Sequence, residues 1–223
     1  MRFEHTQVFN FEGALRGMRA PMASWAKSDS RINWEYGKIP EYMIGPNDME
    51  LCRKLINGGS EHRKFLRQIM VSVDITAPLY WWKEFDTYKV GTTANSTSTM
   101  HKLASTPITL ECFETDDFDP NFVIYTCDIG DNDVDYTANA LLETFIEHLE
   151  RLRQKHNETK DKRYWKELIR LLPNGWLQTR TVTMNYENLR SIAHQRIGHK
   201  LSEWRSFLEW ENTLPYAKEL IFD

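Results

Sequence analysis

Arg196 is the side chain whose position most directly suggests chemistry. Three apolar residues precede it at helical spacing and form one stripe, which Arg196 continues. These residues are Leu189, Ile192 and Ala193. A guanidinium on the packed face of a helix needs a partner, which leaves two possibilities open. The side chain binds an anionic ligand, or the protein satisfies it, through a carboxylate or by letting it reach the surface.

The acidic stretch 128–135 is a second pattern with possible chemistry. Asp131, Asp133 and Asp135 have the alternate spacing of a calcium-binding loop. The match fails because the position that requires glycine for the sharp turn is Tyr136, and the twelfth position is not glutamate. We therefore expect these carboxylates at the N-terminus of the following helix, where they complement its dipole.

Histidine and cysteine spacings do not favour a metal site. His194 and His199 are five positions apart, which does not place two ligands on one helical face. Cys52, Cys112 and Cys127 form no Cys-x-x-Cys pair, and any pairing leaves one thiol over. The sequence therefore predicts no metal ion and no disulfide scaffold, and it favours a reducing cytoplasm. It also lacks a GxSxG elbow, a GxGxxG and a phosphate-binding glycine loop.

The elements that must position these residues alternate between strands and helices. Alternation of polar and apolar residues predicts strands over 3–11, 68–75 and 179–184. Apolar spacing and capping residues predict helices over 49–56, after Pro78, over 138–152 and 164–172, and from 186 to beyond 210. The hydroxyl-rich run 91–99 and the charged run 154–162 read as solvated loops. Strands separated by helices indicate an α/β or α+β domain.

Composition limits the class of protein. The 223 residues are 41% apolar and 13% aromatic, enough for a sizeable core. The net charge of −4 argues against broad nucleic-acid binding, which needs clustered cations in excess. The N-terminus lacks the apolar stretch of a signal peptide, and no run approaches a membrane span. We expect a soluble protein that is not secreted and binds neither membranes nor nucleic acid.

Two stretches resemble the flavin-dependent thymidylate synthases (ThyX family). Residues 172–196, LPNGWLQTRTVTMNYENLRSIAHQR, resemble the family's C-terminal motif of Leu-Pro-Asn, a Thr-Arg-rich strand, Asn-Tyr or Asn-Ala, and a helix ending in Leu-Arg or Met-Arg. Residues 58–98 resemble its core pattern of a Gly-rich turn, Phe-Glu-His, a strand, Ala-Pro and an Arg-His-Arg signature before a serine.

The resemblance implies one ThyX-like domain over residues 1–223, with a central, mostly antiparallel sheet flanked by helices. It implies a cytoplasmic homotetramer that binds FAD where subunits meet. The implied reaction is the reductive methylation of dUMP, or of a related pyrimidine nucleotide. Methylenetetrahydrofolate would supply the carbon and NADPH the electrons. Such a reaction needs no nucleophilic cysteine.

The resemblance also assigns site residues by position. Arg196 would touch the uracil ring and favour its anionic form. Asn185 and Ser191 would contact the flavin. The family's Arg-His-Arg falls on Thr87, Tyr88 and Lys89, so only the last position keeps a cation for the FAD phosphates.

Several other positions depart from the family pattern. A glutamine becomes Glu84, and the glutamate that meets flavin and nucleotide becomes Asn95. The Ser-Gly-Arg that holds the nucleotide phosphate becomes Thr97, Ser98 and Thr99. Exchanging a bidentate arginine–phosphate contact for one hydroxyl costs on the order of 1–3 kcal/mol of binding.

Two further departures affect the family's histidine and one flavin-contacting arginine. The histidine of Phe-Glu-His falls near Gln68, and the arginine becomes Glu187. The segment 84–99 nevertheless contains Gly91 and eight hydroxyl residues, which suggests a rebuilt site. Two functions therefore stay open: a divergent enzyme, or a catalytically inactive flavin- or nucleotide-binding scaffold protein with the same fold.

Overall fold

The computed structural model describes residues 1–34, 41–130 and 132–223, without the side chains of Thr99, Met100 and Ile129. The chain divides into two compact units. Unit 1 comprises residues 1–75, 85–95 and 180–223, and unit 2 comprises residues 76–84 and 96–179. That all 223 residues form one domain stays a prediction.

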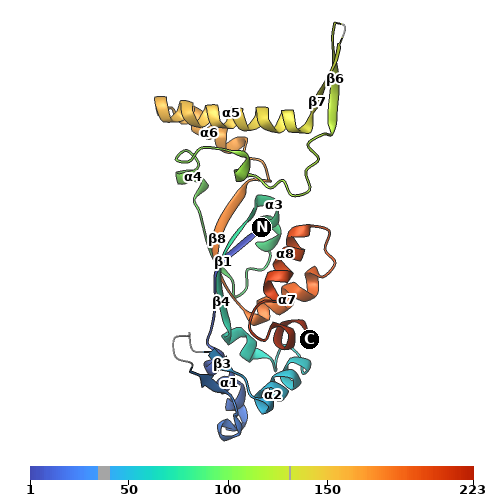
Figure 1. Ribbon diagram of the computed structural model, residues 1–223. Coiled ribbons are helices and arrows are strands. Elements are labelled where there is room, and N and C mark those ends of the chain that lie inside the picture. Colours follow the sequence, from blue (N-terminus) through green and yellow to red (C-terminus); the bar gives the residue numbers. More distant parts are fainter. Residues whose placement is uncertain (35–40, 131) are drawn as a thin grey trace. The chain divides into compact units, whose positions relative to one another are not determined.

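The central sheet has four strands in the order β1-β4-β8-β5. Their bounds are Arg2–Phe9, Met70–Pro78, Leu177–Asn185 and Thr93–Ser96. Figure 1 labels three of them, β1, β4 and β8. In β4 the buried residues Val71, Val73 and Ile75 alternate with more exposed ones, which is the period-2 pattern of a strand with one packed face. The antiparallel sheet flanked by helices confirms the predicted fold class.

Unit 1 contains four of the described α-helices. They are α1 (Phe11–Arg19), α2 (Pro46–Asn57), α7 (Tyr186–Arg196) and α8 (Ser202–Glu211). The strands β2 (Arg31–Asn33) and β3 (Glu41–Met43) pair antiparallel. The prediction of one helix from residue 186 to beyond 210 is wrong at residues 197–201. Gly198 takes φ +74° there, which an α-helix does not accommodate.

Short helical turns connect these elements. The 3₁₀ turns of unit 1 are η1 (Ala20–Met22), η2 (Trp25–Lys27) and η3 (Lys64–Gln68), and a π-helical turn, η5 (Lys218–Phe222), ends the chain. The core of unit 1 holds a continuous series of aromatic contacts. Centroid distances are 5.0 Å for Phe3–Trp210, 5.2 Å for Trp210–Phe207 and 5.7 Å for Phe207–Trp204. Ring packing of this kind fixes side-chain orientation as well as burying area.

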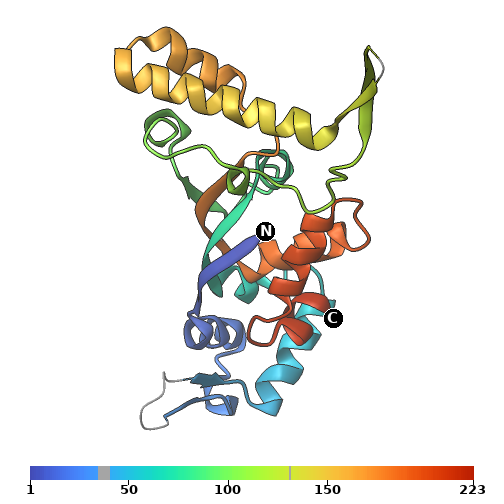
Figure 2. The same cartoon turned by 45° about the horizontal axis from the view of Figure 1, so that its top comes forward.

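Unit 2 is built around a long helix, α5 (Ala138–Thr159), with α6 (Lys162–Arg170) packed beside it (Figure 2). Its apolar core is small, and its buried members are Leu103, Ile108, Phe113, Leu149 and Leu168. The other helical segments are α4 (Thr99–Lys102) and the turn η4 (Leu110–Cys112). Helix α3 (Leu79–Phe85) begins directly after Pro78, as predicted.

The described residues of the acidic stretch 128–135 lie in a hairpin. Strands β6 (Val123–Ile129) and β7 (Asn132–Thr137) pair antiparallel, with Asp128 opposite Asp133. The expectation that these carboxylates occupy a helix N-terminus is therefore wrong for the described residues, and Asp131 lies outside them. Helix α5 is capped instead by Thr137, whose side chain accepts a hydrogen bond from the backbone nitrogen of Ala140.

Two predicted loops are partly regular structure. Residues 93–96 form β5 at the edge of the sheet, where exposed threonine and serine are well tolerated. Helix α5 continues through the charged run to Thr159 and ends where Lys160 takes a left-handed conformation. Charged residues here solvate an exposed helix face and pair along it, as Lys155 does with Glu158 at 3.8 Å. Within the described residues, no helix has the length and apolar character that crossing a membrane requires.

Candidate functional site

Arg196 is the last residue of α7, and its guanidinium lies against two aromatic side chains of unit 1. Its Nε donates a hydrogen bond of 2.8 Å to the hydroxyl of Tyr88. Its guanidinium carbon lies 4.4 Å from the ring centroid of Trp204 and 5.4 Å from that of Tyr88. Because Leu189, Ile192 and Ala193 are fully buried on the same helix, the predicted stripe is confirmed. Tyr88 and Trp204 are thus partners for the Arg196 guanidinium within the protein.

Tyr88 and Trp204 reach Arg196 from different elements. Tyr88 follows the end of α3, whereas Trp204 lies in the first turn of α8 and is fully buried. Their ring centroids are 6.0 Å apart in an edge-to-face arrangement. The break between α7 and α8 allows the second helix to fold back, so that its tryptophan meets the arginine at the end of the first. The chain around Gly198 therefore builds this contact.

A line of hydrogen bonds continues from Arg196 along α7. The hydroxyl of Tyr88 donates to Oε1 of Gln195 at 3.4 Å, and Nε2 of Gln195 donates to Oγ of Ser191 at 2.8 Å. Three residues that the resemblance assigned to the site are thus linked: Arg196, Tyr88 and Ser191. Sequence reasoning missed Gln195. Its spacing of four from Ser191 on a predicted helix was a usable signal.

Asn185 directly precedes α7 and caps its N-terminus. Its side chain accepts a 3.0 Å hydrogen bond from the backbone nitrogen of Asn188, and the Asn188 side chain closes a capping box. Asn188 also donates through Nδ2 to the carbonyl of Val90 at 2.5 Å. This bond ties the segment that follows Tyr88 to the N-terminus of the helix.

Gly91 approaches the same helix closely. It takes φ +75°, and a Cβ atom there would lie 2.9 Å from both the Asn185 amide nitrogen and the Asn188 amide oxygen. Only glycine fits this position without a shift. The hydroxyl of the next residue, Thr92, is buried and has no hydrogen-bond partner among the described residues. A buried polar group without a partner is a potential ligand contact.

A pocket of about 400 Å³ lies along α7. It is lined by Arg63, Glu187, Arg190, Ser191, His194 and Gln195. Because Ser191 and Gln195 belong both to this pocket and to the hydrogen-bonded line from Arg196, the two features adjoin. Together we refer to them as the α7 site.

The charges of the α7 site are partly paired. Nε of Arg63 donates to both carboxylate oxygens of Glu187, at 3.0 and 2.9 Å. Arg190 is buried and donates to the carbonyl of Ile221 at 2.8 Å. Burial, reinforced by Arg190 and Arg63, lowers the pKa of His194, which favours a neutral imidazole at pH 7. The site therefore combines a modest positive charge with hydroxyl, amide and imidazole groups.

The remaining residues assigned from the sequence fall into two groups. Thr87, Lys89 and Asn95 are exposed and belong to unit 1. The other four residues belong to unit 2: Glu84, Thr97, Ser98 and Thr99. That both groups serve one site stays a prediction.

Within unit 2, the phosphate-cradle positions have local roles. The backbone nitrogen of Thr97 donates to the carbonyl of Thr179 at 2.9 Å, and its carbonyl accepts from Gln178 at 3.1 Å. Ser98 accepts at 3.3 Å from the backbone nitrogen of His101, within the first turn of α4. The side chain of Thr99 lies outside the description.

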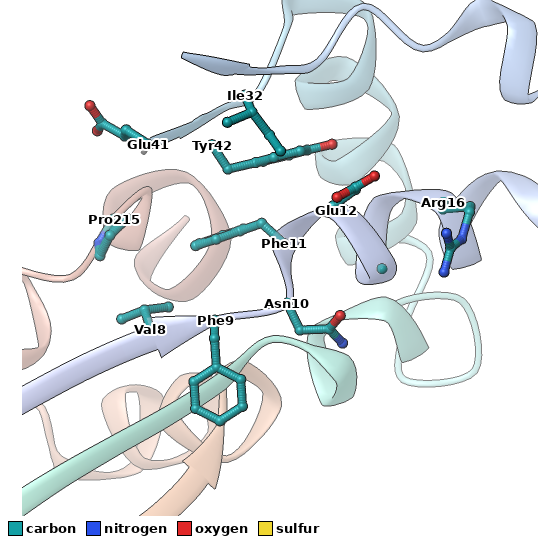
Figure 3. A pocket seen from close by; sticks show the side chains of 11 residues that line it. Val8, Phe9, Asn10, Phe11, Glu12, Arg16, Ile32, Glu41, Tyr42 and Pro215 are labelled. Carbon is teal, nitrogen blue, oxygen red and sulfur yellow. The ribbon is translucent and has the colours of Figure 1, made fainter. Parts of the chain in front are cut away.

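Another cavity of unit 1, about 620 Å³ in volume, shares no lining residue with the α7 site (Figure 3). The rings of Phe11 and Tyr42 lie parallel there, with centroids 6.3 Å apart. One arginine, Arg16, is accompanied by two acids, Glu12 and Glu41. The cavity contains none of the residues assigned from the sequence, so the α7 site is the stronger candidate.

No protein-family model matches the chain, and no curated protein matches it. Solved structures do match, among them two of ThyX. The flavin-dependent thymidylate synthase ThyX from Helicobacter pylori, complexed with FAD and dUMP, has 16% sequence identity and a TM-score of 0.66 over 99% of this chain and 98% of that chain. A second ThyX structure from the same organism, also with FAD and dUMP, has 17% identity and a TM-score of 0.62 over 96% and 94%. Similarity at this level of identity concerns the fold, and the fold of the chain is that of ThyX.

Proposed function

We propose that this chain is a divergent flavin-dependent thymidylate synthase that binds FAD together with dUMP or a related pyrimidine nucleotide. Its reaction would be reductive methylation, with methylenetetrahydrofolate as carbon donor and NADPH as reductant. The observation that carries the proposal is the placement of Arg196. A guanidinium held at the end of α7, beside hydroxyl and amide groups, suits a carbonyl oxygen that gains negative charge.

The donors around the N-terminus of α7 fit the polar edge of a flavin. Two structural observations support this fit: the buried hydroxyl of Thr92 has no hydrogen-bond partner among the described residues, and Gly91 approaches Asn185 closely. We propose that Asn185, Ser191 and Asn95 contact the flavin, and that Lys89 contributes the cation for its phosphates, flanked by Thr87 and Tyr88. When bound, FAD supplies the chemistry that carries the hydride and the one-carbon unit.

On the substrate side we propose Arg196 for the pyrimidine ring and Glu84, Thr97, Ser98 and Thr99 for the rest of the nucleotide. Arg196 would bind and polarise the ring, which makes it the proposed catalytic residue. The hydroxyl residues would replace an arginine at the phosphate. Because each exchange costs on the order of 1–3 kcal/mol, we expect weak nucleotide affinity.

We further propose a cytoplasmic homotetramer whose sites lie at subunit interfaces. Large apolar side chains that are exposed in the single chain support assembly. Trp34 is 75% exposed, Ile197 66% and Phe122 62%. Exposed apolar groups of this size suit burial between subunits.

A second candidate is a catalytically inactive flavin- or nucleotide-binding protein with the same fold. The Arg63–Glu187 pair favours it, because an acid occupies a flavin-contacting position and uses a neighbouring cation. Such a protein would bind one or both ligands without methyl transfer. Turnover separates the two candidates, and binding alone does not.

The test begins with the visible absorption spectrum of the purified protein, recorded before and after addition of FAD and then dUMP. The proposal expects a flavin band that shifts when dUMP is added. Arg196→Ala should abolish the dUMP-induced shift while the flavin band stays. Arg16→Ala, an exposed arginine away from the α7 residues in sequence, serves as the matched control. Protein that binds neither ligand would refute both candidates.

A further inference from the structure

We propose that Tyr88 and Trp204 are positioning residues that hold the guanidinium of Arg196 in one orientation and thereby set pyrimidine affinity. This inference rests on the proposed function for the identity of the ligand, whereas the holding of the arginine rests on the geometry alone. In this role neither aromatic residue would touch the pyrimidine nucleotide. They would act through Arg196.

The two residues engage different parts of the guanidinium. Trp204 lies beneath it, with its ring centroid 4.4 Å from the guanidinium carbon. At the edge of the guanidinium, Nε donates a 2.8 Å hydrogen bond to the hydroxyl of Tyr88. The ring centroid of Tyr88 is 5.4 Å from the guanidinium carbon. A face contact and an edge contact together oppose rotation of a planar group.

The two holders are themselves fixed by packing. Trp204 is fully buried and contacts Phe207 edge-to-face at 5.7 Å. The ring centroid of Phe85 lies 6.4 Å from that of Tyr88 and 6.1 Å from that of Phe207. The rings thus close a circuit from Tyr88 through Phe85, Phe207 and Trp204 back to Tyr88. The guanidinium therefore contacts two rings, Tyr88 and Trp204, that are packed against other aromatic side chains.

The direction of the hydrogen bonds at Tyr88 is also determined. Arginine Nε can only donate, so the phenol oxygen accepts from Arg196 and its proton is available for another group. Oε1 of Gln195 can only accept, and it lies 3.4 Å away. Nε2 of Gln195 then donates to Ser191 at 2.8 Å. Phenylalanine at position 88 would keep the ring contact and remove both links of the hydroxyl.

Holding the arginine before binding changes the affinity that it can provide. A flexible arginine must lose rotamer freedom when a ligand binds, whereas a fixed one has lost it during folding. A hydrogen bond to a charged group contributes enough that its loss corresponds to about a tenfold or larger weakening of binding. We therefore expect Tyr88→Phe to weaken dUMP binding by about tenfold through this route.

The first measurement needs no ligand. The purified protein, with no FAD or dUMP added, is treated with phenylglyoxal, which modifies accessible arginine side chains, and the rate at Arg196 is followed by peptide mass spectrometry. Tyr88→Phe should accelerate modification of Arg196 severalfold, while exposed Arg16 in the same sample should react at an unchanged rate. Tyr125→Phe, at a half-exposed tyrosine of β6, is the matched control and should change neither rate. An unchanged Arg196 rate in Tyr88→Phe would overturn the inference.

The second measurement is calorimetric titration of the same proteins, now loaded with FAD, with dUMP. The inference expects about tenfold weaker binding in Tyr88→Phe, and no further loss when Tyr88→Phe is added to Arg196→Ala. Equal affinity of Tyr88→Phe and the unaltered protein would overturn it. If the unaltered protein does not bind dUMP while Tyr88→Phe still accelerates labelling, the proposed function fails and the positioning of Arg196 stands.

Discussion

Replacing Glu211 by glutamine should stabilise the protein at neutral pH. Glu211 ends α8 with its side chain fully buried, and neither carboxylate oxygen has a hydrogen-bond partner among the described residues. Burial raises its pKa from 4.5 to about 9. An ionised carboxylate without a partner is costly in the interior, so the folded protein keeps this group protonated.

The magnitude follows from proton linkage. Because the pKa is raised in the folded state, the stability of the folded form is greatest below pH 4.5 and is lost progressively as pH rises toward 9. Between these values the unfolded chain releases the proton and the folded chain does not. Each pH unit costs about 1.4 kcal/mol, so the 2.5 units from 4.5 to 7 correspond to about 3 kcal/mol at pH 7. Glutamine has a similar shape and no proton to release, so it avoids this cost.

The assay is urea unfolding of the two proteins at pH 5, 7 and 8.5. The free energy of unfolding of Glu211→Gln should exceed that of the unaltered protein by an amount that grows with pH. Glu209→Gln, an exposed glutamate on the same helix, is the control and should show no such growth. A difference between the proteins that is constant across the three pH values would refute the reasoning, because only an altered titration makes it depend on pH.

Two further predictions concern carboxylates whose pKa is lowered. Asp48 is fully buried and accepts hydrogen bonds from Arg19, Ser28 and Ser30, so Asp48→Asn should lower the free energy of unfolding in urea by about 3–5 kcal/mol, because it leaves Arg19 without its charge partner. Glu150 accepts from Arg153 and has a pKa lowered to about 2, so its stabilising contribution is present above pH 4.5 and is lost as pH falls toward 2. Thermal melts of Glu150→Gln should therefore show a lower Tm than the unaltered protein at pH 7, and a smaller difference at pH 3.

The α7 region shows how much of the fold local patterns can predict. The spacing of Leu189, Ile192 and Ala193 predicts both the helix and its packed face, and the structure confirms both. The N-cap of α7 is Asn185, and asparagine is one of the residue types preferred at that position. These features depend on residues within one or two turns of each other, so the sequence displays them directly.

Features that depend on distant residues were not predictable in the same way. Arg196 was correctly placed on the stripe, but its partner Tyr88 lies 108 positions away in the chain. The buried pair of Arg19 and Asp48 likewise joins two helices that no local pattern connects. The polar residues of β5 predict a loop. Its pairing in the sheet decides its conformation instead, and no local pattern shows that pairing.

The prediction for the acidic stretch is also wrong for a physical reason. Aspartates near the start of a helix usually complement its dipole, and that rule suggested the wrong location for Asp133 and Asp135. Alternation of Val134 and Tyr136 with these acids was the competing signal for a strand. Because both patterns fit the same short stretch, only the pairing of β6 with β7 distinguishes them.

The unpaired edges of the β6–β7 hairpin bear on association between molecules. Its two strands pair only with each other in the described sheets, so each presents one unpaired backbone edge, and apolar side chains such as Val123 and Ile124 are exposed beside it. Such an edge invites a strand from another molecule. The charges of Asp128, Asp133 and Asp135 lie on these same strands, and an identical hairpin brought alongside would set like charges close together. Asp133 and Asp135, two of the carboxylates that resemble a calcium loop in the sequence, are therefore expected to disfavour edge-to-edge association.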